Sequence, residues 1–230
     1  AGIYSYAEEG FGSFAAFNSA FGYWVSLLLG NVALATLSMS ALSYFMPVFG
    51  AGSNGFSVIV ASIFLWGMHY ITLQGSHFAS KINSLITGAK LIPLAIFIIF
   101  ILFNLDPTIF KADFLGPGMS SFSWSAVTPQ LRNAMIVSVW VFLGVEGAIV
   151  YSSRAENKEV ISRANVLSFA LITIVYLLAT VGSFGIMHRA EIAALNKPAM
   201  AQIMGAMVGD WGVSFINLGV FISSMGCWFA

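Results

Sequence analysis

One carboxylate stands inside an apolar segment. Glu146 lies in the run 140–147, between Gly144 and Gly147. A carboxylate at bilayer depth is costly and usually faces a cavity or a partner, and glycine costs a helix about 1 kcal/mol relative to alanine. The pattern predicts a discontinuous helix that lines a binding site. The alternative is a glutamate near the end of a short helix that reaches the membrane interface.

Lys90 is a second ionisable group within an apolar segment, one to two turns inside a helix expected at 83–104. A lysine near a helix end can lie along the apolar surface and place its ammonium at the interface. The other interpretation is a fixed cation inside the protein. The residues alone leave both open.

Aromatic and small polar residues form the remaining candidates. Trp140 precedes Gly144 by one turn, and Trp228 follows Gly226 closely. A large ring beside a flexible backbone could act as a movable lid, although packing or interfacial anchoring is the usual role of such aromatics. A further set, which would ordinarily serve close helix packing or hydrogen bonding between membrane helices, consists of Ser26, Gly30 and Asn31.

The sequence contains no motif for binding a metal, a cofactor or a nucleic acid. The histidines His69, His77 and His188 lack the spacing of metal ligands, and the single Cys227 excludes a disulfide framework. Phosphate-loop and nucleophile-elbow motifs are absent. The formal net charge is zero and no basic patch occurs. We therefore expect no enzyme, no metal, no cofactor and no nucleic-acid partner.

The elements that position these residues are predicted to be membrane-spanning helices. Of the 230 residues, 59% are hydrophobic and 8% charged, against about 25% charged in soluble domains. No charged residue occurs between Glu9 and Lys81, and a helix crosses a bilayer with about 20 residues. The apolar run 91–102 does not alternate as a barrel strand would. The sequence predicts an all-α membrane protein in a lipid bilayer.

Apolar segments separated by turn residues predict one integral membrane domain over residues 1–230. Residues 105–130 form the longest polar stretch, and 188–209 resemble one or two short amphipathic helices. A count of cations in the links does not decide the orientation, although their density favours a cytoplasmic 152–164 link. The expected spans are about 14–46, 56–74, 83–104, 131–152 and 165–187, and a sixth beginning near Trp211.

Both ends of the chain suggest a fragment of a longer protein. The chain opens without Met on the polar and aromatic run Ala1–Tyr6 and stops at Ala230 inside an apolar run.

Several segments together resemble the amino acid–polyamine–organocation superfamily of transporters. Within it they look most like the basic amino acid/polyamine antiporters, such as arginine–ornithine exchangers. The opening run 1–12 is similar to the family motif after its second helix, and 23–33 to its third helix. The run 140–147 resembles the unwound sixth helix and is the most specific match, while 225–228 looks like the eighth.

The resemblance implies a twelve-helix transporter with a five-plus-five inverted repeat (LeuT-like) in the plasma or inner membrane. This chain would run from the end of helix two to the middle of helix eight, with a cytoplasmic amino end. Alternating access would move the substrate, and about six membrane helices would lie in the fragment.

The resemblance also implies roles by position. Trp140 would be a gate over the substrate, and Glu146 a gating or coupling carboxylate in the unwound segment with Gly144 and Gly147. Trp228 would stack on the substrate. Lys90 would stand where sodium-independent relatives carry a lysine in place of a sodium ion. The residues expected to face the substrate from the third helix are Ser26, Leu27 and Asn31.

The leading hypothesis is exchange of a cationic amino acid for a related amino acid or amine. One alternative is a proton-coupled amino-acid uptake permease, because Glu146 and Lys90 can both titrate. A more remote alternative is a membrane receptor or scaffold without transport, and an intramembrane enzyme is remoter still. A homodimer is left open, and the sequence does not identify the substrate.

Overall fold

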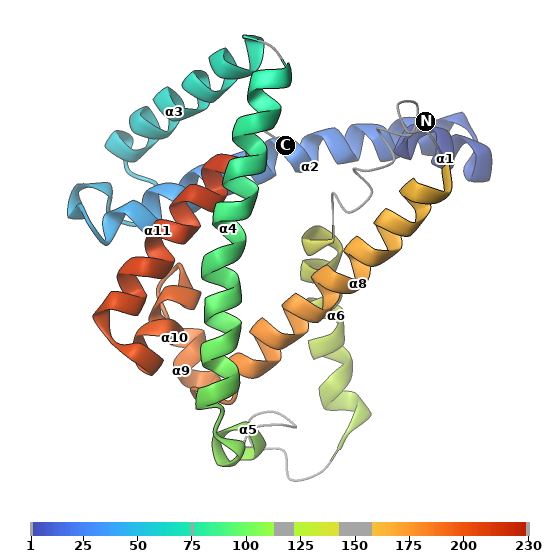
Figure 1. Ribbon diagram of the computed structural model, residues 1–230. Coiled ribbons are helices and arrows are strands. Elements are labelled where there is room, and N and C mark those ends of the chain that lie inside the picture. The colour runs from blue at the N-terminus through green and yellow to red at the C-terminus, as the bar shows by residue number, and fades with distance from the viewer. Residues whose placement is uncertain (1, 75, 113–121, 143–157, 229–230) are drawn as a thin grey trace. The chain divides into compact units, whose positions relative to one another are not determined.

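The computed structural model describes the backbone of residues 2–74, 76–112, 122–142 and 158–228, and this part of the chain contains helices and no strands. Figure 1 shows their course along the chain. The elements are α1 (Ile3–Phe11), α2 (Ser13–Ser43), the 3-10 helix η1 (Pro47–Phe49), α3 (Gly55–Leu73), α4 (Ser76–Asn104), α5 (Pro107–Ala112), α6 (Trp124–Val141), α8 (Lys158–Ser183), α9 (Arg189–Ala194), α10 (Ala199–Val208) and α11 (Asp210–Cys227).

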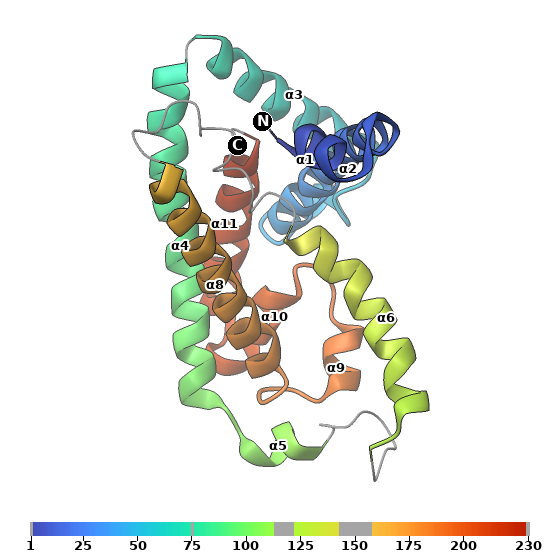
Figure 2. The ribbon, with the colours of Figure 1, turned by 90° about the vertical axis from the view of Figure 1, so that its right-hand side faces the viewer.

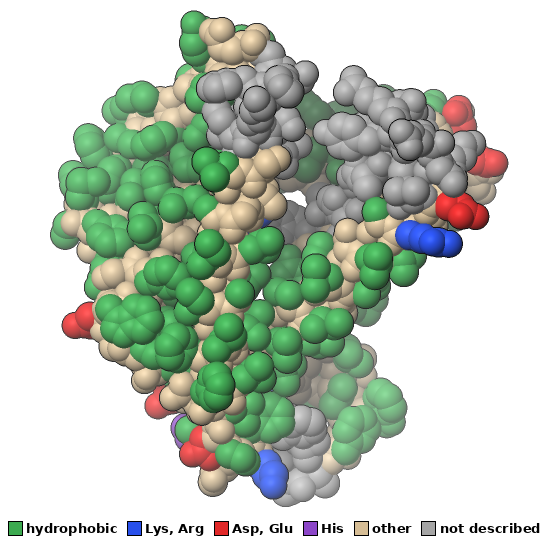
Figure 3. Space-filling view, in the orientation of Figure 1, with side chains coloured by type: hydrophobic (Ala, Val, Ile, Leu, Met, Phe, Trp, Pro, Cys, Tyr) green, Lys and Arg blue, Asp and Glu red, His purple; other side chains and the backbone are tan. Residues whose placement is uncertain are grey.

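Four stretches of these helices are long and apolar enough to cross a membrane: Ser13–Ser43, Gly55–Leu73, Ser84–Asn104 and Ser162–Ser183. The predicted span 131–152 overlaps α6 and continues outside the described residues, and the sixth predicted span coincides with α11; α6 and α11 have 18 residues each and are not among these four stretches. On the face shown in Figure 3, hydrophobic side chains are spread over α11 and over the described side chains of α4. The predicted all-α membrane class is confirmed.

Several helices are longer than the apolar segments that predicted them. α4 begins at Ser76 rather than near 83, α6 at Trp124 rather than near 131, and α8 at Lys158 rather than near 165. Apolar runs mark only the part of a helix that lies in lipid, while polar residues extend the same helix into water. α1 was not predicted, because its nine residues are too few for a membrane span.

The chain divides into two compact units. Unit 1 comprises Ala1–Trp24 and Asp113–Leu178, and unit 2 comprises Val25–Ala112 and Ala179–Ala230. In unit 1, the Phe142 ring after α6 lies 5.2 Å from Phe169 and 5.9 Å from Tyr176 of α8, centroid to centroid. These aromatic contacts join the end of α6 to α8.

A buried cluster joins α4, α10 and α11 in unit 2, and α4 and α11 run side by side in both ribbon views (Figures 1 and 2). Glycines recur on one face of α11 at Gly212, Gly219 and Gly226, each seven residues after the last. A Cβ atom on Gly219 would lie 2.5 Å from Cγ of Pro93, and one on Gly226 would collide with Ile86. The cluster itself consists of Phe97, Ile101, Ala201, Ile203, Met204 and Ile216.

A second buried cluster joins four elements of unit 2. It contains Met39 of α2, Phe49 of η1, Ala61 of α3 and Met225 of α11. This cluster ties the carboxyl end of α11 to the α2–α3 hairpin.

Polar side chains within the helices mostly bond to their own helix. Ser38 Oγ donates to the Leu34 carbonyl at 2.8 Å, and Thr173 Oγ1 to the Phe169 carbonyl at 2.7 Å. Such bonds to the preceding turn satisfy a hydroxyl without a partner helix.

Candidate functional site

The predicted substrate-facing residues of the first long helix occupy adjacent turns of α2. Asn31 Nδ2 donates to the Leu27 carbonyl at 3.0 Å, so the amide nitrogen stays with its own helix. Leu27 is 43% exposed, Asn31 is also exposed, and Ser26 is half-buried. The amide oxygen of Asn31 is therefore the group that this turn can offer to a ligand.

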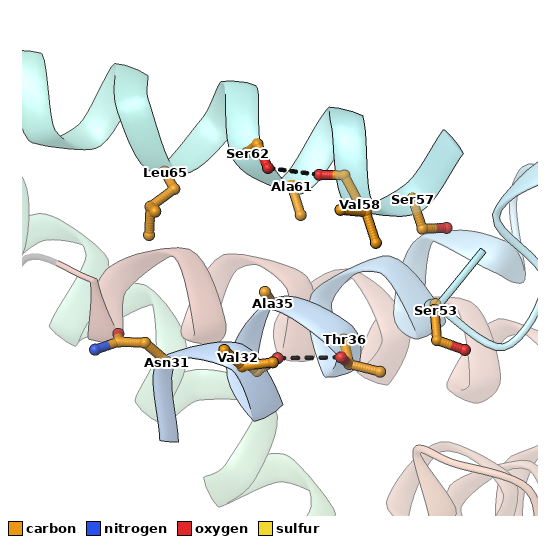
Figure 4. A pocket seen from close by; sticks show the side chains of 11 residues that line it. Asn31, Val32, Ala35, Thr36, Ser53, Ser57, Val58, Ala61, Ser62 and Leu65 are labelled. Carbon is orange, nitrogen blue, oxygen red and sulfur yellow. Dashed lines mark hydrogen bonds between the residues drawn. The ribbon is translucent and has the colours of Figure 1, made fainter. Parts of the chain in front are cut away.

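A cleft opens between α2 and α3 beside Asn31, with a volume of about 380 Å³. In Figure 4, Ala61 and Leu65 of α3 point toward α2, and Ala35 of α2 points toward α3. Thr36 Oγ1 donates to the Val32 carbonyl at 3.0 Å, and Ser62 Oγ donates to the Val58 carbonyl at 2.7 Å. None of its described lining residues is charged. The cleft thus offers apolar surface and a few oxygen acceptors.

Trp228 follows the last residue of α11 and borders the same region. Its half-buried side chain packs against the cluster of Met39, Phe49, Ala61 and Met225. Ala61 also lines the α2–α3 cleft. The indole Nε1 is buried and has no hydrogen-bond partner among the described residues. An unpaired buried donor is costly. A hydrogen-bond acceptor on a ligand could therefore satisfy the Trp228 N–H.

Lys90 lies on the face of α4 that packs against α11. Ile86 and Pro93, which meet Gly226 and Gly219 of α11, lie one turn before and one turn after Lys90. Residues at this spacing share a helix face. Lys90 is half-buried. Both interpretations of Lys90 are compatible with this position, and its role stays a prediction.

The remaining predicted residues lie in and after α6. The backbone of Trp140 belongs to α6, but its side chain lies outside the described residues. Gly144, Glu146 and Gly147 also lie outside the described residues. The gate and the coupling carboxylate stay predictions.

Two buried polar residues of α11 were not singled out from the sequence. Asn217 is 3% exposed; its Nδ2 donates to the Val213 carbonyl at 2.9 Å, and its Oδ1 has no partner among the described residues. Ser224 is 2% exposed and bonds to the Val220 carbonyl. The two residues are seven positions apart and lie on one helix face. Asn217 could have been identified from the sequence as an amide inside an apolar segment.

No group of three His, Cys, Asp or Glu side chains that could hold a metal ion occurs in the described part of the chain.

Comparison with known proteins gives one family over the whole sequence. A family model described as amino acid permease matches residues 1–230. The chain is 42% identical over 225 residues to the arginine/ornithine antiporter of Pseudomonas aeruginosa, covering 98% of this chain and 46% of the relative. It is 44% identical over 227 residues to the arginine/ornithine antiporter of Latilactobacillus sakei, covering 99% and 48%.

A relative whose name gives agmatine in place of ornithine is similar over the same span. The arginine/agmatine antiporter of Chlamydia caviae is 37% identical over 230 residues, covering 99% of this chain and 47% of the relative. The chain spans about half the length of the curated relatives it matches.

Proposed function

Because the chain belongs to the amino acid permease family and is a multi-pass cell-membrane protein, we propose that it works in exchange of a cationic amino acid for a related amino acid or amine. The observation that carries this proposal is the similarity over 98% or more of the chain to proteins named arginine/ornithine and arginine/agmatine antiporters. Both compact units belong, in this proposal, to one integral membrane domain.

The described residues support recognition of a cation without a buried acid. Trp228 packs beside the α2–α3 cleft, whose described lining carries no charge. A cation over a tryptophan ring gains about 0.5–2 kcal/mol, so Trp228 can select an alkylammonium or guanidinium group. Ser26, Leu27 and Asn31 would contact the rest of the substrate, Trp140 would close over it, and Glu146 between Gly144 and Gly147 would couple closure to binding.

The same proposal assigns no enzymatic step and no cofactor. The named relatives are antiporters, and transport requires only that the loaded site open to each side of the membrane in turn. In this proposal the Lys90 side chain lies between α4 and α11 and takes the place of a bound sodium ion.

The exchange is tested by loading proteoliposomes of the native protein with ornithine, with agmatine or with buffer. Uptake of labelled arginine should be fast into loaded vesicles and slow into buffer-filled ones, because an exchanger returns only with a bound substrate. Full-rate uptake into buffer-filled vesicles that follows a proton gradient would favour the proton-coupled permease. Absence of any arginine movement would favour a receptor.

Lys90→Gln tests the internal cation in the same assay. We expect exchange to fall at least about tenfold, equivalent to about 1.4 kcal/mol, while replacing sodium by choline leaves the unaltered protein unaffected. Lys111→Gln, which removes an exposed lysine at the end of α5, is the control and should keep full exchange. Full exchange by a folded Lys90→Gln protein would refute the assigned role.

A further inference from the structure

A pocket of about 830 Å³ lies in unit 2 along the second half of α2, and we name it the hydroxyl pocket. Its walls come from α2, from the turn between α2 and α3, and from the link before α10. Small-molecule sites in proteins have volumes of about 300–1,000 Å³, so the space is large enough for a metabolite. The lining residues used below are Thr36, Leu37, Ser40 and Ser43 of α2 with Lys197 of the link.

The wall made by the turn between α2 and α3 is fixed by its own bonds. Asn54 Oδ1 accepts from the Ser57 backbone N–H at 2.8 Å, and Asn54 Nδ2 donates to the Val48 carbonyl at 2.8 Å. Gly52 has a φ of +83°, and a Cβ atom on it would collide with the Thr36 carbonyl. The turn therefore packs directly on the α2 backbone, and this wall exists before a ligand binds.

The wall made by the link before α10 is tied to the same helix. Ser40 is 8% exposed, and its Oγ donates to the Lys197 carbonyl at 3.1 Å. Gln202 Nε2 of α10 donates to the Asn196 carbonyl at 2.6 Å. These bonds hold the backbone of the link beside α2. The exposed Lys197 side chain is the only charged group in the described lining of the pocket.

Hydroxyl oxygens and apolar surface surround this lysine. Ser43 Oγ donates to the Ser40 carbonyl at 2.7 Å, and Thr36 Oγ1 donates to the Val32 carbonyl at 3.0 Å. Both hydrogens are therefore used, and the two oxygens can only accept further bonds. Leu37 adds apolar surface on the same wall. The complementary ligand has a carboxylate beside an ammonium, on an aliphatic chain.

We propose that the hydroxyl pocket is a second subsite for the transported amino acid, with its α-carboxylate on the Lys197 ammonium and its α-ammonium donating to Ser43 Oγ. Lys197 and Ser43 both bond to Ser40, so two charged groups on one carbon atom can reach them together. The identity of the amino acid rests on the proposed function.

The subsite adjoins the candidate site on α2. Thr36 lines both the hydroxyl pocket and the α2–α3 cleft, which opens beside Asn31. The aliphatic side chain of the bound amino acid extends along Leu37 toward this shared wall. An amine without a carboxylate, such as agmatine, would bring a second positive charge to Lys197 and is not held here.

The test counts labelled arginine bound at saturation to the native full-length protein in detergent. Two arginines should bind to each unaltered chain. Lys197→Gln should weaken the second at least about tenfold, the effect of losing one charge-assisted hydrogen bond, and the first arginine, still bound, shows that the variant is folded. Ser43→Ala should weaken the second arginine less, because the lysine contact remains. One arginine per unaltered chain would overturn the proposal.

Lys111→Gln removes an exposed lysine that does not line the pocket and should leave both arginines bound. An equal loss for this variant and for Lys197→Gln would reduce the effect to general surface charge and overturn the proposal. Agmatine has no carboxylate and acetate has no ammonium, so neither should readily displace the second arginine. Displacement by either as readily as by unlabelled arginine would also overturn it.

Exchange into ornithine-loaded vesicles separates this subsite from the proposed function. Absence of exchange in a protein that binds two arginines would refute the proposed function and leave the subsite standing. Exchange by a protein that binds one arginine would do the reverse.

Discussion

At the scale of single residues, Trp228 combines tight packing with an unmet hydrogen bond. Its ring contacts the cluster of Met39, Phe49, Ala61 and Met225, while Nε1 is buried without a partner among the described residues. The packing of the Trp228 ring and its unpaired N–H therefore contribute separately to the stability of the protein. Different substitutions can distinguish the two contributions.

Trp228→Phe and Trp228→Leu separate these contributions. Phenylalanine keeps an aromatic ring and removes the unpaired donor, whose burial costs about 1–3 kcal/mol, so the substrate-free protein should be as stable as before or more stable. Leucine removes the ring, and arginine binding should weaken by about 0.5–2 kcal/mol. Thermal unfolding and calorimetric titration with arginine give the two readouts. Equal destabilisation by both substitutions would show that the indole nitrogen has a partner.

Part of the candidate site was predictable at this scale. An ionisable side chain in an apolar run is visible without a structure, and Lys90 was identified in this way. Its position on the α4 face toward α11 was not predictable, because it depends on which neighbouring helix meets Ile86 and Pro93. Asn217 was missed for a related reason: its significance lies in a burial that only packing creates.

At the scale of elements, the contact between α4 and α11 depends on the absence of side chains. Gly219 lies against the Pro93 ring, and Gly226 against Ile86. Small residues of this kind let membrane helices approach closely, where dispersion and weak polar contacts hold them together. A proline ring is rigid, so it cannot move aside as the end of a long side chain would.

Gly219→Ala should therefore destabilise unit 2 by about 1–3 kcal/mol, the usual cost of overpacking. Gly88→Ala is the matched control on α4, because a Cβ there meets nothing within 4 Å, and alanine improves helix propensity by up to about 1 kcal/mol. Thermal unfolding in one detergent compares the two variants. Equal unfolding temperatures would contradict the assigned contact.

The sequence predicted the presence of the long helices better than their limits. Apolar runs identified α2, α3, α4 and α8 because lipid demands continuous apolar surface. The beginning of α6 at Trp124 was missed, since Pro129 within the helix suggested a loop. Pro129 lies in the second turn of α6, where its missing N–H leaves the Ser125 carbonyl without its usual helical donor.

At the scale of the whole molecule, charge depletion and helix length fix how the chain relates to the bilayer. α4 has 29 residues, so at about 1.5 Å per residue it exceeds the thickness of the hydrocarbon core. Its two ends must lie on opposite sides of the membrane. The links tied to its carboxyl end then share one side.

Cysteine labelling tests this arrangement in a Cys227→Ser background. Cysteines at Lys111, after α4, and at Lys197, in the link bonded to Ser40, should react with a membrane-impermeant maleimide from the same side. A cysteine at Gln74, before α4, should react from the other side. Labelling of positions 111 and 197 from opposite sides would contradict this arrangement.

The hydroxyl and amide groups that bond back to their own helix also affect how the protein is made. Ser38, Ser62 and Thr173 each donate to the carbonyl four residues earlier, so none needs a neighbouring helix to satisfy its hydrogen. A helix whose polar side chains bond to its own backbone can leave the translocon alone and remain in lipid until other helices pack against it. Assembly of such helices then requires only packing between them. The order in which the helices associate can therefore differ from the order in which they are synthesised.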